Sequence, residues 1–174
     1  RRLRVRSLLP PTVVPTATTR FPARRDQQIV NQFHPGGVRV DLLRPELLLV
    51  PTGKSLQGPP PPYVPGIDHF QCYRVRGGSL LRNAVSATDQ FGTITVGVKR
   101  ALRVCVPVNK NNEGIVDGSQ VLTCYKARSR AGPPRRDPIE TTNQFENATD
   151  FVFGLRELCV PSLEDPAFAT GMAR

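Results

Sequence analysis

Four cysteines carry the clearest potential for chemistry in this sequence. They are Cys72, Cys105, Cys124 and Cys159. Thiols can ligate a metal ion, oxidise to disulfides or act as nucleophiles. Structural zinc sites usually place cysteines about two to four residues apart, and the sequence has no such pair. The spacing therefore favours disulfides, with a four-cysteine metal site or free core thiols as the alternatives.

The cysteines belong to an internal repeat of three short motifs. The matching segments are "HFQCYRVR" (69–76) and "VLTCYKAR" (121–128), "TDQF" (88–91) and "TNQF" (142–145), and "LRVCVP" (102–107) and "RELCVP" (156–161). From Phe91 to Cys105 and from Phe145 to Cys159 the distance is 14 positions in both copies. Neither histidine of the sequence, His34 or His69, recurs between copies, which argues against a cysteine–histidine catalytic pair.

A third copy, which has lost its cysteines, lies upstream. "NQF" (31–33) is followed by "ELLLVPTGK" (46–54), and Leu49 stands where the other copies have cysteine. No Cys-Tyr segment precedes this copy, so both cysteines of the pair are absent together. Four cysteines can pair in three ways, and this joint absence selects Cys72 with Cys105 and Cys124 with Cys159. Each disulfide would stabilise its repeat by roughly 3 to 4 kcal/mol, and both imply an oxidising compartment and export.

The Asp/Asn-Gln-Phe motif recurs in all three copies. It comprises Asn31, Gln32 and Phe33, then Asp89, Gln90 and Phe91, then Asn143, Gln144 and Phe145. An acid–base group would not tolerate the exchange of aspartate for asparagine, whereas a side-chain oxygen that caps a turn would. We therefore expect a structural motif in which the glutamine bonds the backbone and the phenylalanine is buried, with ligand binding as the alternative. Tyr73 and Tyr125 are expected to be core aromatics with bonded hydroxyl groups.

Short strands are the elements that must position these motifs. The 18 prolines and 14 glycines disfavour long helices, and "TITVGV" (93–98) alternates apolar and small or polar residues with the period of a strand. About four short strands per copy predict an all-β fold of tandem disulfide-stapled repeats, packed as small sandwich or barrel units. A β-trefoil-like arrangement is the alternative.

Composition also divides the chain into segments. The expected order is a basic, extended, Pro-rich arm (1–20), a first repeat without cysteines (21–57), a polyproline linker (58–66), a second repeat (67–110), a third repeat (111–163) and a tail (164–174). About fifty residues bury too little apolar surface to be very stable alone. We therefore expect the repeats to need disulfides or packing against a neighbour.

The net charge of +10 and the pI near 10.3 predict attraction to polyanions. Two clusters could contact such a polymer or a protein partner. They are Arg1, Arg2, Arg4 and Arg6 at the amino end, and Arg128, Arg130, Arg135 and Arg136 in the third repeat. No aromatic residues interleave with these clusters and no nucleic-acid-binding motif is found, so nucleic acid is not the expected partner.

Motifs of known catalytic chemistry are not found either, so we expect no catalytic residue, no metal and no cofactor. A hydrolase that uses unrecognised loop residues, among them His34, His69 or Asp89, is a less favoured hypothesis. The sequence has no run of apolar residues long enough to predict a transmembrane segment.

The motif set resembles an uncharacterised family of exported bacterial repeat proteins, over about residues 66–163. The resemblance implies export and tandem repetition, and it implies no activity. Our leading hypothesis is a non-enzymatic extracellular structural or interaction protein. It would assemble with copies of itself or with a larger cell-surface or filament complex, through strand addition of its amino-terminal arm. The alternative is a binding module for an acidic polysaccharide, cell-wall polymer or other polyanion.

Overall fold

The described part of the chain is built from β-strands without a helix. The computed structural model describes residues 21–61, 66–89, 92–129, 138–151 and 154–164. These residues form ten strands: β1 (Arg24–Asn31), β2 (His34–Leu49), β3 (Gly53–Ser55), β4 (His69–Gly77), β5 (Arg82–Asp89), β6 (Gly92–Val108), β7 (Val121–Ser129), β8 (Ile139–Thr142), β9 (Asn147–Asp150) and β10 (Glu157–Glu164). The expected arm (1–20) and nearly all of the expected tail lie outside the described residues. The all-β class is confirmed.

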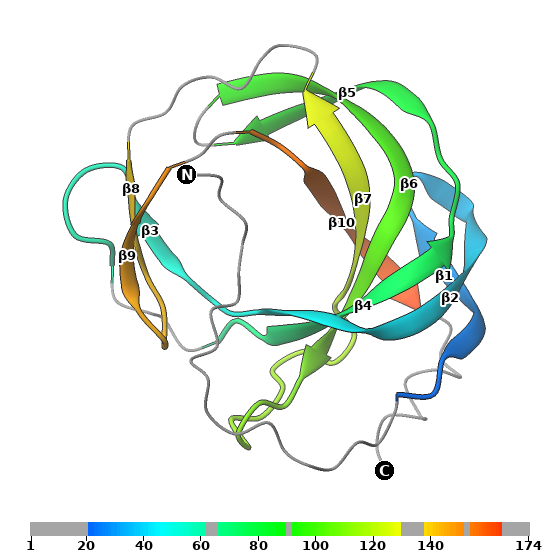
Figure 1. The fold of residues 1–174 in the computed structure, drawn as a ribbon, viewed down its shortest axis with the longest axis horizontal. Helices are drawn as coiled ribbons and strands as arrows, with labels where there is room; N and C mark the ends of the chain where they lie inside the picture. The colour runs from blue at the N-terminus through cyan, green and yellow to red at the C-terminus, as the bar shows by residue number, and fades with distance from the viewer. Residues whose placement is uncertain (1–20, 62–65, 90–91, 130–137, 152–153, 165–174) are drawn as a thin grey trace.

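Six strands form a closed antiparallel barrel. Its order is β4-β2-β1-β10-β7-β6, and pairing of β4 with β6 closes the ring (Figure 1). Strand β5 lies outside this ring and pairs with the first half of β6. Closure provides each of the six ring strands with a neighbour on both sides, which removes the open edges that a flat sheet would leave.

The three repeats share this one barrel. The first repeat supplies β1 and β2, the second supplies β4 and β6, and the third supplies β7 and β10, each as an adjacent pair. A pair of strands is too small to enclose a core by itself, so three pairs close around a common interior. The arrangement has the pseudo-threefold order of the trefoil-like alternative, and it differs from one small unit per repeat.

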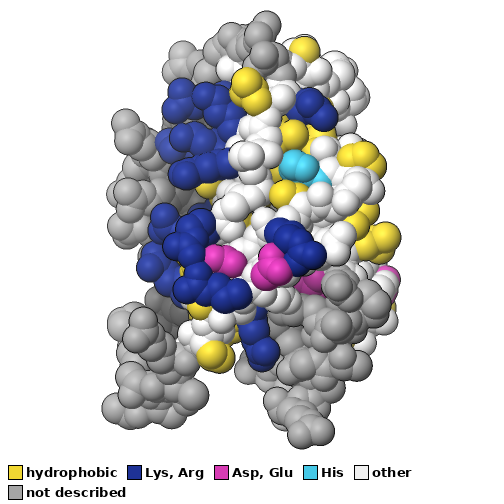
Figure 2. All heavy atoms as spheres, turned by 90° about the vertical axis from the view of Figure 1, so that its right-hand side faces the viewer, with side chains coloured by type: hydrophobic (Ala, Val, Ile, Leu, Met, Phe, Trp, Pro, Cys, Tyr) yellow, Lys and Arg dark blue, Asp and Glu magenta, His cyan; other side chains and the backbone are white. Residues whose placement is uncertain are grey.

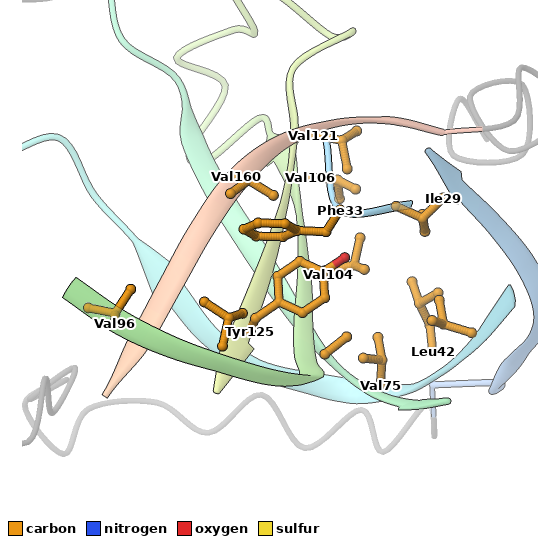
Figure 3. Close-up of a cluster of buried hydrophobic side chains, with 13 residues drawn as sticks. Ile29, Phe33, Leu42, Val75, Val96, Val104, Val106, Val121, Tyr125 and Val160 are labelled. Carbon is orange, nitrogen blue, oxygen red and sulfur yellow. The ribbon is translucent and has the colours of Figure 1, made fainter. Parts of the chain in front are cut away.

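Apolar side chains from all six ring strands fill the barrel. Every second residue of a strand points inward, and Val104 and Val106 of β6 are buried in this way. Phe33 lies edge-on to Tyr125 at 5.3 Å between ring centroids (Figure 3). The buried cluster is completed by Ile29, Val40, Leu42, Val75, Val96, Val98, Ala101, Val121 and Val160.

A small second sheet joins the first and third repeats. Its order is β3-β8-β9, and Gly53 of β3 pairs with Thr142 of β8. The carbonyl oxygen of Pro61 passes so near that a Cβ atom on Gly53 would lie 2.4 Å from it, which only glycine avoids. The first part of the expected polyproline linker (58–66) therefore packs against β3, while residues 62–65 lie outside the described residues.

The connection between β6 and β7 is anchored to the start of β4. Asp68 is buried, and its carboxylate accepts hydrogen bonds from the backbone N–H groups of Val116 at 2.6 Å and Asp117 at 2.8 Å. Lys110 and Glu113 form an ion pair in the same connection. The buried carboxylate of Asp68 thus holds the connection between β6 and β7 through charge-assisted hydrogen bonds. The described ranges contain no helix that is long and apolar enough to cross a membrane.

Candidate functional site: disulfide clasp, asparagine turns and arginine groove

Two disulfides join strands that are neighbours in the barrel. Cys72 of β4 bonds Cys105 of β6, and Cys124 of β7 bonds Cys159 of β10. In both bridges the two residues are direct cross-strand partners in the register. The pairing predicted from the repeat is therefore present in the structure, and each bridge joins the first and last ring strands of one repeat.

The two disulfides lie side by side and form one clasp. The sulfur atoms of Cys105 and Cys124 are 3.9 Å apart. Since Cys105 alternates with the inward-facing Val104 and Val106, the clasp lies on the outer face of the barrel, where Phe70 packs against it. Four consecutive strands of the ring are thereby held together. None of the four cysteines is a free thiol, so they supply no nucleophile.

The asparagine of the repeated motif caps a turn in two copies. The Oδ1 atom of Asn31 accepts hydrogen bonds from the backbone N–H groups of Phe33 at 3.0 Å and His34 at 3.2 Å. In the third copy Asn143 Oδ1 accepts from Phe145 at 2.8 Å and Glu146 at 3.2 Å. Both are the turns that an aspartate or asparagine stabilises with its side chain, as the sequence comparison predicts.

The rest of the motif differs between copies. Phe33 is buried in the barrel, whereas Phe145 is 53% exposed, so the expectation of a core phenylalanine is wrong for the third copy. The reason is position: the Asn143 turn connects β8 to β9 in the small sheet, which lies outside the barrel. Gln32 and Gln144 are both exposed. In the second copy, Gln90, Phe91 and the side chain of Asp89 are not described.

Asn31 also belongs to a buried polar network inside the barrel. Its Nδ2 group donates to Tyr125 Oη at 2.9 Å and to Ser162 Oγ at 3.2 Å. The hydroxyl groups of Ser162 and Thr123 are 2.7 Å apart. Tyr125 is fully buried with its hydroxyl bonded, as expected, and Tyr73 is half-buried against the same core. The network joins β1, β7 and β10 and fixes their register, since a slip would leave buried polar groups unpaired.

Three further titratable groups are buried or half-buried. His34 stacks on Tyr125 at 6.0 Å between ring centroids, and burial lowers the pKa of its imidazole. His69 is buried and places Nε2 2.9 Å from Glu113 Oε2. Glu164 follows Ser162 on the inward side of β10; its Oε1 atom is buried with no hydrogen-bond partner, and burial raises the pKa of this carboxyl to about 7. Within the described ranges no three His, Cys, Asp or Glu side chains form a metal-ligating group.

Of the predicted polyanion-contact residues, the structure describes Arg128 alone, and it is exposed on β7. Arg1, Arg2, Arg4, Arg6, Arg130, Arg135 and Arg136 lie outside the described residues. A different basic site was missed by the sequence reasoning: a groove of about 450 Å³ between β4 and β6, lined in part by Arg74, Arg76, Arg100 and Arg103. The sequence pattern that could have indicated this groove is the alternation of Arg74 and Arg76 with Val75.

Acidic side chains neutralise one rim of this groove. The hydrogen bond from Arg76, together with those from the Asp26 backbone and Arg25, lowers the pKa of the Asp41 carboxyl to about 2. Asp41 Oδ2 lies 2.9 Å from both Arg25 and Arg76. This part of the surface is therefore a network of charges. Arg103 is also paired, with Glu46 and Glu157, so Arg74 and Arg100 are the groove arginines that are candidates for contact with a ligand.

Comparison with known proteins identifies one family. The sequence model described as "Repeat of unknown function (DUF7450)" matches residues 16–131, about two thirds of the chain. Neither a curated protein nor a solved structure matches the chain.

Proposed function

Because the chain belongs to this family of repeats of unknown function, we propose its function from its geometry. The protein is an exported, non-enzymatic structural or interaction module. It assembles with copies of itself, or with a larger extracellular complex, by adding a β-strand to the edge of β5. The observation that carries this proposal is that no strand in the described ranges pairs with the outer edge of β5.

Among the strands that the structure describes, β5 has one neighbour, whereas each of the six ring strands has two. It pairs with β6 from Arg82 to Asp89, and no other described strand bonds its far side. An exposed edge of this length offers a row of backbone N–H and C=O groups to a second chain. Globular proteins usually protect such edges with Lys, Pro or a covering segment, and residues 84–88 contain neither Lys nor Pro.

The amino-terminal arm has the sequence of a donated strand. "LRV" (3–5) and "TVV" (12–14) contain the β-branched and apolar residues that favour strands, and the arm has too few apolar residues for a core of its own. Residues 84–88 are uncharged while the arm is basic, so no charge repulsion opposes their pairing. An arm of one copy on the β5 edge of the next copy would propagate a chain of subunits.

Export is supported by the disulfide clasp. Disulfides persist in oxidising compartments, and two of them in a chain of this size are typical of secreted proteins. The closed barrel, held by two disulfides on its outer face, is also rigid. This suits a structural module better than one that changes shape.

Two changes test the proposal by separate routes. Deletion of residues 1–20 removes the donor, and Ala84→Lys with Ser86→Lys places charge on the exposed face of the acceptor strand. The matched control is Gln57→Lys with Gln144→Lys, which adds the same charge at exposed positions outside the large sheet. The molar mass of each variant is measured by light scattering across a concentration series.

The expected result is assembly by the wild type and by the control, and monomers from both the deletion and the β5 variant. Unchanged far-ultraviolet circular dichroism would show that the barrel persists in each variant. Assembly that survives both changes contradicts the proposal.

A further inference from the structure

The groove between β4 and β6 arises from a divergence of the two strands. They pair from His69 with Val108 as far as Arg74 with Arg103. Beyond this point the pairing of β6 with β7 is irregular between Val98 and Arg103, and β6 moves away from β4. A single backbone hydrogen bond, from Ala101 N–H to the Gly78 carbonyl at 3.0 Å, reconnects the two sides. The open segment between these points forms the groove of about 450 Å³.

Positive charge dominates the walls of this groove. Its lining holds four arginines and one acid, Glu46. Arg103 is already engaged, since its Nε atom lies 2.9 Å from Glu46 and its Nη1 atom bonds Glu157. Arg76 bonds Asp41, as described above.

Two guanidinium groups are left over. Arg74 and Arg100 are exposed at the groove, and neither has a hydrogen bond or ion pair with any residue that the structure describes. They therefore provide donors that no residue of the described ranges uses.

Charges are also aligned unfavourably beside the groove. Arg44 of β2, Arg74 of β4 and Arg103 of β6 are successive cross-strand partners. Like charges directly opposite one another on a sheet are destabilising. In the third repeat the position equivalent to Arg74 and Arg103 pairs Lys126 with Glu157, which are opposite charges. In the second repeat Glu46 and Glu157 neutralise Arg103, whereas Arg44 and Arg74 lie opposite each other with no acidic partner among the described residues.

We propose that this groove binds the carboxylate or sulfate groups of an extended acidic polysaccharide, with Arg74 and Arg100 as the main donors. Guanidinium groups donate paired hydrogen bonds that fit the planar carboxylate and the sulfate oxygens. Single-stranded nucleic acid is the less suitable polyanion, because its binding sites stack bases on aromatic side chains and the lining of this groove has none. Figure 2 shows Lys and Arg side chains gathered in a column on the barrel face that carries β1 and β2, with Asp and Glu side chains against the lower part of the column. An extended polymer suits such a column better than a small anion does.

This site is independent of strand addition at β5, because a polysaccharide could bind the monomer. The test uses the full chain and polygalacturonate as the probe, measured by calorimetry at several salt concentrations. The groove variant is Arg74→Ala with Arg100→Ala. The matched control is Arg82→Ala with Arg156→Ala, which removes the same charge from exposed positions outside the lining of the groove. Inorganic sulfate and a single-stranded DNA of equal charge are compared as ligands.

The expected result is polygalacturonate binding that weakens as salt rises, falls by about tenfold or more in the groove variant and changes less than about twofold in the control. The melting temperature of the groove variant should match or exceed that of the wild type, since Arg74→Ala relieves the repulsion between Arg74 and Arg44. Equal losses in the groove variant and the control would overturn the site, because binding would then follow net charge alone. Tighter binding of the DNA, or of free sulfate, would overturn the class of ligand, and no binding of polygalacturonate at low salt would overturn both.

Discussion

Replacing Cys72 and Cys105 together by alanine removes half of the clasp, and the structure allows the loss to be worked out. The two cysteines are 33 residues apart, and closing a loop of that length in the unfolded chain is worth about 3.7 kcal/mol. Both sulfur atoms are buried, and each void left by a lost sulfur adds roughly 1 kcal/mol. The free energy of unfolding should therefore fall by about 5 to 6 kcal/mol, which lowers the melting temperature by roughly 10 to 20 °C in a chain of this size.

The second disulfide provides the matched comparison. Cys124 and Cys159 are 35 residues apart, so the loop contribution is the same within about 0.1 kcal/mol. Cys124 is buried but Cys159 is exposed, so its double alanine variant should lose about 1 kcal/mol less than the first. Urea unfolding followed by circular dichroism measures both losses. A loss below about 2 kcal/mol for the first pair, or a larger loss for the second pair, would refute the reasoning.

Three further predictions concern single side chains. Asn31→Ala should destabilise the protein by about 2 to 4 kcal/mol in urea unfolding, because it leaves buried partners unpaired, whereas Asn143→Ala in the exposed turn should cost about 1 kcal/mol or less; equal losses would contradict this. Glu164 has a folded-state pKa of about 7, above its usual 4.5, so its contribution is complete below pH 4.5 and is lost as pH rises through 7. Unfolding at pH 5 and pH 8 should therefore show a decline that Glu164→Gln reduces, and an unchanged decline would disprove the assignment. Asp68→Ala should release the β6–β7 connection and speed cleavage by trypsin at Lys110, which mass spectrometry detects; unchanged cleavage would show that the two backbone hydrogen bonds do not hold the loop.

The disulfide pairing could be predicted from the sequence because comparison of the repeat copies shows which cysteines are present or absent together. The degenerate copy lacks both cysteines, and this joint loss selected the correct bridges. The asparagine turns were predictable for a similar reason, since Asp89 in one copy aligns with Asn31 and Asn143 in the others. Such turns depend on residues two or three apart, so neighbouring sequence is sufficient to identify them.

Closure of the barrel depends on contacts that local patterns do not contain. Asn31 bonds Tyr125 across 94 positions of sequence, and no motif records that pairing. The same motif therefore buries Phe33 in the barrel and exposes Phe145 on the small sheet. The arginine groove was missed because it requires the irregular pairing of β6 near Arg100, which changes which residues face the solvent.

Hydrogen exchange at β5 tests the central claim most directly. Amide exchange of residues 84–88 is compared between the assembled full-length protein and the protein diluted to its monomer. The account predicts that amides on the far side of β5 exchange quickly in the monomer and become protected on assembly, together with amides of residues 1–20. Equal exchange of residues 84–88 in the two states, with protection gained at another surface, would contradict assembly by strand addition.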